Sequence, residues 1–292
     1  MKNTLKNISF ILFLSLFCGA ANSAYTSGLS DHKEHHDKPG KVFLKNYKES
    51  DFEITHTELS FELHDTSTLI RSNLHITPKK KGKALVLDGE QSSIKLLNVL
   101  INRKNLDPSE YIVDDNTLTI HKLPKENFVL TIVNSINPIE NKELSGLYKS
   151  NGIFTTQCES EGFRRITYFL DRPDVMSRYT VTIVADAEKY PILISNGDLI
   201  GTRTFKDGRH LAEFKDPFPK PSYLFALVAG DLAKVCDQFT TMSGKVVDLE
   251  IYTEHGQEKR TDFAMDALKR SMKWDEDAYG REYDLNTLRM LA

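Results

Sequence analysis

Alternation of apolar and polar residues dominates the chain from residue 52 onward and predicts β-strands. Residues two apart in a strand point to the same face, so this period indicates strands with one buried face. Turn-forming pairs such as Asp88-Gly89 and Asp115-Asn116 separate the apolar runs. The predicted strands lie at residues 52–54, 59–63, 84–87, 97–101, 118–120, 128–132, 179–185, 192–195 and 223–229. Many short strands at this spacing predict a mainly β domain of the β-sandwich type.

The pattern changes after residue 231. Residues 245–252 predict one more strand, and residues 261–279 predict a helix that ends at Gly280. Apolar residues at helical spacing predict a broad buried face on this helix, which also includes Ala264, Leu268, Met272 and Tyr279. The residues that define this face are Phe263, Ala267, Trp274 and Ala278. We therefore expect Trp274 to pack in a core.

The first 24 residues have the pattern of a cleavable signal peptide. Lys2 and Lys6 precede an apolar run at residues 8–18, and small residues follow at 19–24. This run is too short for a permanent membrane helix, which needs about 20 residues. We expect cleavage after Ser23 or Ala24 and export to the periplasm or medium. Acylation of Cys18 is a less favoured alternative, because Ser15 stands where lipoprotein signals usually have leucine.

Residues 25–40 are polar and rich in breakers, which predicts a disordered lead-in. Its three histidines, His32, His35 and His36, would bind a metal only weakly, because a mobile tail lacks ordered supporting groups. The formal net charge of −3 argues against nucleic acid as a partner. Cys158 and Cys236 remain after signal cleavage, and the sequence leaves open whether they pair or stay free. No feature indicates an oligomeric state.

Candidate chemistry lies in the stretch from Thr155 to Phe163. If this stretch begins as a strand, Gln157 and Glu159 share one face. A carboxamide oxygen and a carboxylate close together suit a cation with several N–H donors, such as a peptide's α-ammonium. The alternative is that the two glutamates here, Glu159 and Glu161, form surface ion pairs with the arginines that follow, Arg164, Arg165 and Arg172.

Residues 155–175 resemble the bacterial type of aminopeptidase N, a family of zinc metallo-aminopeptidases. Further blocks agree in the family's order: residues 190–197, 216–221, 223–231 and 271–276. The resemblance implies a saddle-like amino-terminal β domain at residues 41–231. It also implies that residues 232–292 are the first strand and helix of a thermolysin-like α/β catalytic domain. By the same resemblance, Gln157 and Glu159 help to bind the amino terminus of the peptide substrate.

The zinc-binding part of the family pattern does not occur in these 292 residues. None of the nine histidines is followed by glutamate, so His-Glu-x-x-His is missing, and so is Gly-x-Met-Glu-Asn. The resemblance ends at Leu285, and Arg289 would be costly in a strand that the family buries. We expect no catalytic residue and no metal ligand in this chain, and zinc only in the full-length enzyme. We therefore interpret the chain as a truncated or frameshifted gene product, or as a fragment that is inactive alone.

A second hypothesis is an exported, non-catalytic β-sandwich module that binds a peptide or a partner protein. The nucleotide sequence beyond codon 292 distinguishes the two hypotheses. A continuation that encodes the two missing motifs would favour the aminopeptidase, and an unrelated continuation would favour the binding module.

Overall fold

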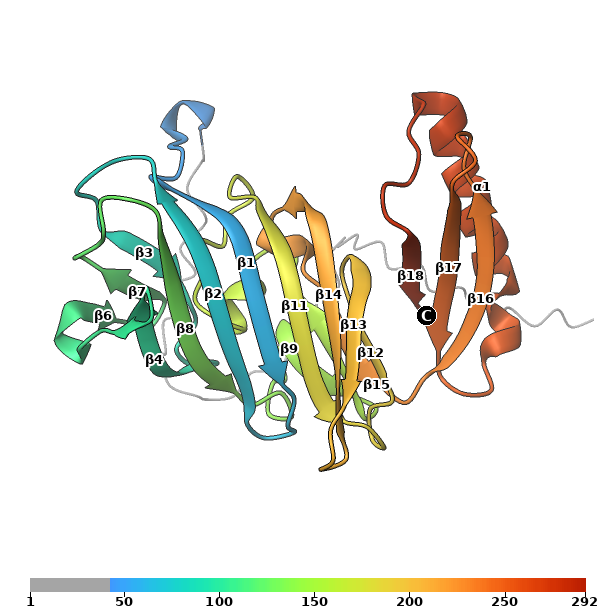
Figure 1. Ribbon diagram of the computed structural model, residues 1–292, viewed down its shortest axis with the longest axis horizontal. Coiled ribbons are helices and arrows are strands. Elements are labelled where there is room, and N and C mark those ends of the chain that lie inside the picture. The colour runs from blue at the N-terminus through green and yellow to red at the C-terminus, as the bar shows by residue number, and fades with distance from the viewer. Residues whose placement is uncertain (1–42) are drawn as a thin grey trace, which may run out of the picture. The chain divides into compact units, whose positions relative to one another are not determined.

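The computed structural model in Figure 1 describes residues 43–292. The predicted signal peptide, the lead-in and the histidines at 32, 35 and 36 lie outside the described residues. Residues 44–46 form a 3₁₀ turn that belongs to a separate unit, and residues 48–292 form the second unit. Within the described part of the chain, no helix is both long and apolar enough to span a membrane.

The largest sheet has eight strands in the order β13-β14-β11-β1-β2-β8-β4-β5 (Figure 1). All neighbouring strands in it are antiparallel except β1 and β11, which are parallel. The strands are β1 (Phe52–Glu62), β2 (Thr68–Pro78), β4 (Lys95–Ile101), β5 (Lys104–Asn105), β8 (Phe128–Ile136), β11 (Ser177–Asp186), β13 (Asp198–Thr204) and β14 (Arg209–Lys220).

A shift of register in β1 explains a change in its apolar pattern. Ile54 and Leu59 are both buried although they differ in parity along the strand. The pairing of β1 with β2 is irregular between Ile54 and His56, which moves the buried face from even to odd positions. The apolar residues on both sides of this irregularity therefore reach the same core.

Two smaller sheets complete the β domain. One has the order β12-β15-β10-β9, with β9 (Gly146–Ser150), β10 (Ile153–Gln157), β12 (Ile192–Ser195) and β15 (Leu227–Gly230). The other has the order β3-β7-β6, with β3 (Leu85–Asp88), β6 (Tyr111–Val113) and β7 (Thr117–Ile120). A single hydrophobic core contains residues from all three sheets. The prediction of a mainly β domain built from packed sheets is confirmed.

The last sixty residues form a third small sheet and one long helix. Strand β17 (Val246–Thr253) lies between β16 (Ala233–Thr240), which is antiparallel to it, and β18 (Thr287–Leu291), which is parallel. Helix α1 (Asp262–Tyr279) ends at Gly280 in the left-handed conformation, with φ of 62°. The predicted strand and helix are therefore present. Val247, Leu249 and Ile251 form a separate core with Met265 and Met272 of α1.

The predicted buried face of α1 is wrong in its main members. Phe263 is 69% exposed and Trp274 is 57% exposed. Among the described aromatic residues, the Trp274 ring contacts only Tyr279, in a T-shaped arrangement. The buried side is instead a narrower stripe that contains Met265, Met272 and Glu276. A broad apolar face does not show which of its edges meets the sheet, and the packing of β17 selects the methionine edge.

Two further expectations need correction at the strand level. The strand predicted at residues 223–229 begins only at Leu227, because a 3₁₀ turn occupies residues 222–224 after Pro221. Arg289 lies in β18, where its Nε is 2.9 Å from Glu250 and its Nη1 donates to the Gly197 carbonyl at 2.9 Å. These partners offset the expected cost of a charged residue in this strand.

Candidate functional site

Strand β10 positions the first of the two predicted site residues. Gln157 is the last residue of β10 and pairs with Gly146 of β9. Glu159 lies beyond the strand, so the extended segment is shorter than expected. Exposure nevertheless alternates through this point, since Gln157 and Glu159 are exposed and Cys158 between them is buried. The Gln157 Nε2 donates to the Glu159 carbonyl oxygen at 3.2 Å and so links the two residues.

Each arginine near this loop forms an ion pair with a carboxylate other than that of Glu159. Arg164 Nε lies 2.9 Å from Asp171, and the same guanidinium lies 3.4 Å from Glu161. The other two pairs are Arg165 with Glu90 at 2.8 Å and Arg172 with Asp174 at 2.7 Å. The ion-pair alternative therefore applies to Glu161.

The carboxylate of Glu159 differs from that of Glu161. Among residues 43–292, the Glu159 side chain has no ion pair and no hydrogen bond. An exposed carboxylate without a protein partner is free to bind a cation from solution. Among the described residues, the Glu159 carboxylate is therefore unpaired, whereas the Glu161 carboxylate pairs with Arg164.

A close approach of the backbone shapes the loop after Glu159. The Gly162 N–H donates to the Cys158 carbonyl at 2.8 Å. A Cβ at residue 162 would lie 2.3 Å from the Gln157 carbonyl oxygen and 2.9 Å from Cys158 Cα. Only glycine fits this turn without moving the end of β10. The next residue, Phe163, is fully buried against the rings of Phe169 and Phe225.

Asp171 connects the same loop to distant parts of the fold. Its carboxylate accepts hydrogen bonds from the Arg164 backbone and guanidinium and, at 2.5 Å, from the Ser222 hydroxyl. Its own N–H donates to Asp88 at 3.1 Å. Burial raises the pKa of Asp88, and the nearby Arg164 charge opposes that rise. The loop that carries Glu159 is thus supported by a buried polar network.

Burial disfavours the thiolate form of the cysteine between the two predicted site residues. Cys158 is buried and Cys236 is exposed, and both thiols are free in the structure. Burial raises the pKa of the Cys158 thiol, with a smaller contribution from Asp171. A thiol that stays protonated is a poor nucleophile. Cys158 therefore acts as a small packing residue beneath the loop.

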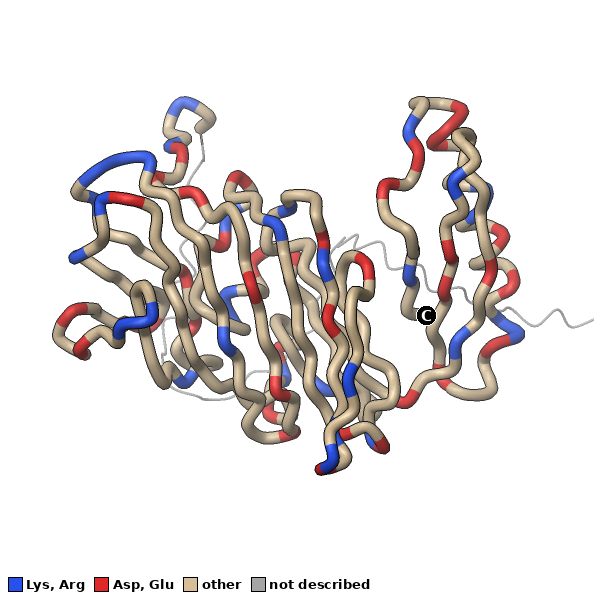
Figure 2. Tube along the Cα trace, in the orientation of Figure 1, with Lys and Arg blue, Asp and Glu red and all other residues tan. Residues whose placement is uncertain are grey.

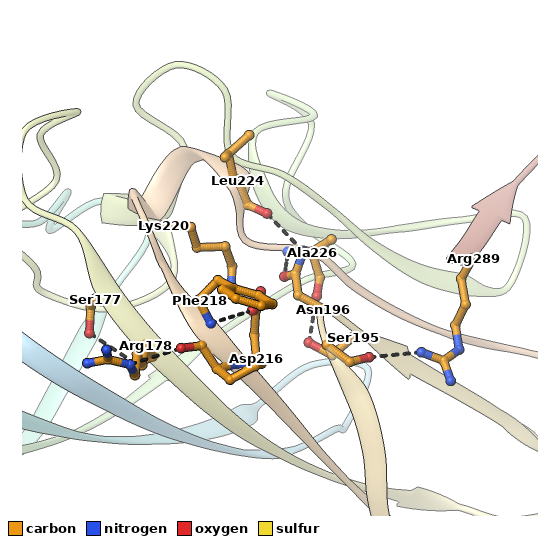
Figure 3. A network of polar contacts seen from close by, with 12 residues as sticks. Ser177, Arg178, Ser195, Asn196, Asp216, Phe218, Lys220, Leu224, Ala226 and Arg289 are labelled. Carbon is orange, nitrogen blue, oxygen red and sulfur yellow. Dashed lines mark hydrogen bonds and ion pairs between the residues drawn. The ribbon is translucent and has the colours of Figure 1, made fainter. Parts of the chain in front are cut away.

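The blocks at residues 195–197 and 216–221 form a polar network of structural type (Figure 3). Lys220 Nζ lies 2.8 Å from Asp216 and 4.1 Å from the centre of the Tyr179 ring, and both charged residues are buried. Burial lowers the pKa of Lys220, and the Asp216 charge opposes this shift. Asn196 donates to the Leu224 carbonyl and accepts from the Ala226 N–H, which holds the turn before β15.

Within residues 43–292, no three or more histidine, cysteine, aspartate or glutamate side chains are grouped so that they could hold a metal ion.

Comparison with known proteins identifies relatives over most of the chain. The peptidase M1 N-terminal domain matches residues 44–224. Aminopeptidase N of Caulobacter vibrioides is 50% identical over 257 residues, which are 88% of this chain and 29% of that protein. Aminopeptidase N of Escherichia coli is 43% identical over 87% of this chain and 29% of its own length. The chain thus spans about 29% of the length of these curated relatives.

Solved structures agree with this result. The crystal structure of Legionella pneumophila aminopeptidase A in complex with aspartic acid is 34% identical, with a TM-score of 0.80, over 85% of this chain and 29% of that chain. A two-domain M1 zinc metallopeptidase mutant bound to L-tryptophan has a TM-score of 0.70 at 15% identity, over 83% of this chain and 57% of that chain, which supports the fold alone. The extent of the family match and the 50% identity together show that this chain belongs to the M1 peptidase family.

Proposed function

We propose that this chain is the amino-terminal portion of a zinc-dependent aminopeptidase and that Gln157 and Glu159 bind the α-ammonium of the peptide substrate. The observation that carries this proposal is the free carboxylate of Glu159, in a loop whose other charges are paired. The zinc chemistry is assigned to parts of the full-length enzyme other than these residues, because the sequence contains no His-Glu-x-x-His motif.

The orientation of Gln157 supports recognition of an ammonium group. Its Nε2 is occupied by the Glu159 carbonyl, so its Oε1 is the group left to accept a hydrogen bond. An α-ammonium has three N–H donors, which a carboxylate and a carboxamide oxygen can accept together. An acetylated amine has no charge and one donor, so it would bind poorly. This chemistry selects peptides with a free amino terminus.

An NMR titration tests the amine site in the 292-residue chain. L-alaninamide is expected to shift the backbone amides around Gln157 and Glu159, whereas N-acetyl-L-alaninamide is not. Glu159→Gln is expected to weaken binding about tenfold, because a charge-assisted hydrogen bond contributes about 1.5–3 kcal/mol.

The matched control is Glu161→Gln in the same loop. Because Glu161 already pairs with Arg164 at 3.4 Å, its loss is expected to leave alaninamide binding almost unchanged. Equal weakening by the two substitutions would show that only the net charge of the loop matters. Binding of the acetylated compound as tightly as the free amine would contradict the proposed site.

We also propose that the enzyme is exported. The support is the sequence pattern of residues 1–24, with lysines, an apolar run and small residues in that order. The expected result is a mature protein that begins at Ala24 or Tyr25, measured by mass spectrometry of the amino-terminal peptide. A mature amino terminus at Met1 would contradict export by this signal.

A further inference from the structure

A groove of about 640 Å³ lies on the eight-stranded sheet, away from Gln157 and Glu159 in sequence. Its lining comes from β1, β2, β8 and β4, which lie side by side in Figure 1, and from the turn after β4. Apolar side chains of these strands alternate into the core, so their polar residues face outward. The polar residues that line the groove include Arg71, Asn73, His75, Asn102, Arg103 and Thr131.

Among the described residues, Glu58 is the only acidic side chain that lines this groove, and two neighbouring side chains contact it. Asn73 Nδ2 lies 3.0 Å from one of its carboxylate oxygens, and His75 Nε2 lies 3.2 Å from the other. The side-chain Oδ1 of Asn73 in turn accepts a hydrogen bond from the Thr131 hydroxyl at 2.8 Å. This network spans three neighbouring strands and engages both carboxylate oxygens of Glu58. It leaves the two arginines of the groove as the charged donors that are available.

Neither guanidinium has a partner in the part of the protein that the structure describes. Among residues 43–292, Arg71 and Arg103 form no hydrogen bond through their side chains, no ion pair and no ring contact. Each planar guanidinium presents a fork of N–H donors that matches a carboxylate or phosphate group. The arginines of the Glu159 loop differ from these two, because nearby carboxylates engage them.

The backbone places Arg103 at the groove in an uncommon conformation. Asn102 and Arg103 form the two-residue turn between β4 and β5, with φ of 48° and 67°. Turns of this kind favour glycine at the second position. The turn is fixed to β8, because the Asn102 N–H donates to the Val129 carbonyl and the Asn102 Oδ1 accepts from the Val129 N–H, both at 2.9 Å. Arginine therefore occupies a rigid position where glycine would fit the backbone better.

We propose that this groove binds a small polyanion, with Arg71 and Arg103 each binding one of its phosphate or carboxylate groups. The volume of the groove falls in the range of small-molecule sites. Two guanidinium groups with no internal partner match a ligand with at least two anionic groups. The chain as a whole has a net charge of −3, and basic and acidic residues are interspersed along it (Figure 2), so the attraction is local to the groove.

NMR titrations of the 292-residue chain with pyrophosphate and, separately, with citrate test this proposal. Binding is expected to shift the amides of Asn102, Arg103, Val129 and Thr131 and to weaken as salt is added. Binding of pyrophosphate alone supports a phosphate ligand, binding of citrate alone supports a carboxylate ligand, and binding of both supports either source.

Substitutions separate binding from folding. Arg71→Gln and Arg103→Gln are each expected to weaken binding about tenfold, the effect of losing one charge-assisted pair. Arg103→Gly suits the turn better, so it is expected to fold at least as stably and still lose binding. The matched control is Arg203→Gln on β13, an exposed arginine of the same sheet outside the groove. Failure of both anions to shift these amides would overturn the proposal, and so would equal weakening by Arg203→Gln or full affinity in Arg103→Gly.

Discussion

Replacement of Asp171 by alanine is expected to lower the free energy of unfolding by about 3–5 kcal/mol. The carboxylate side chain is only 1% exposed and pairs with Arg164, whose side chain is 24% exposed. Its removal leaves a largely buried guanidinium without its main partner and leaves the Ser222 hydroxyl without an acceptor. Equilibrium unfolding in urea, followed by far-UV circular dichroism, measures the effect.

An exposed ion pair provides the control for Asp171. Asp266 and Arg270 lie four residues apart on α1 at 2.8 Å, with side chains 64% and 63% exposed. Asp266→Ala is expected to change the free energy of unfolding by about 0.5 kcal/mol or less, because solvent screens such pairs. If the two substitutions had similar effects, Asp171 would not be the buried connection described here.

Gly162→Ala is expected to destabilise the chain by about 3 kcal/mol, the upper part of the usual range for overpacking. The new methyl group would lie 2.3 Å from the Gln157 carbonyl oxygen, and backbone atoms cannot rotate away as a side chain can. Relief of this contact must move the end of β10 or the loop that carries Glu159. The same variant is therefore expected to lose alaninamide binding even where it remains folded.

Gly201→Ala in strand β13 is the matched control. Its Cβ would lie 3.6 Å from the nearest atom, a side-chain oxygen of Glu213, which is an ordinary contact. We expect little change in stability, since alanine also restricts the unfolded chain more than glycine does. Equal destabilisation by the two substitutions, measured by urea unfolding, would show that close packing at Gly162 is not the cause.

The elements that the sequence predicts correctly are those with an alternating or helical pattern and a buried face. Strand β11 alternates throughout, β1 alternates on each side of its register shift, and α1 ends at Gly280 as expected. Strands β13 and β16 are edge strands with almost no buried residue, so they carry little periodic signal. Hydrogen bonds to a neighbouring strand define them, and a local pattern does not contain that information.

In the candidate site, too, the sequence predicts some features and not others. The types and spacing of Gln157 and Glu159, with the family resemblance, identify the residues of interest. The sequence does not show that Arg164 pairs with Asp171, or that Asp171 also binds Ser222, fifty-one residues away. The contact that distinguishes Glu161 from Glu159 is the Arg164–Glu161 ion pair at 3.4 Å, which depends on how the loop folds. The polyanion groove is also invisible in sequence, because Arg71 and Arg103 come together only through the pairing of β2, β8 and β4.

A chimera provides the most direct test of the proposal that this chain supplies the α-amine site of an aminopeptidase. Residues 1–285 would replace the matching part of Caulobacter vibrioides aminopeptidase N, which is 50% identical over 257 residues. With zinc present, the chimera is predicted to hydrolyse an alanyl chromogenic substrate, and the 292-residue chain alone is not.

The decisive quantity is kcat/KM of the chimera and its two glutamate variants. Glu159→Gln is predicted to lower kcat/KM about tenfold or more, because loss of a charge-assisted hydrogen bond costs about 1.5–3 kcal/mol. Glu161→Gln is predicted to leave kcat/KM nearly unchanged, because Arg164 already holds that carboxylate. An unchanged kcat/KM in Glu159→Gln, or an equal loss in both variants, would contradict the assignment of Glu159 to the substrate amine.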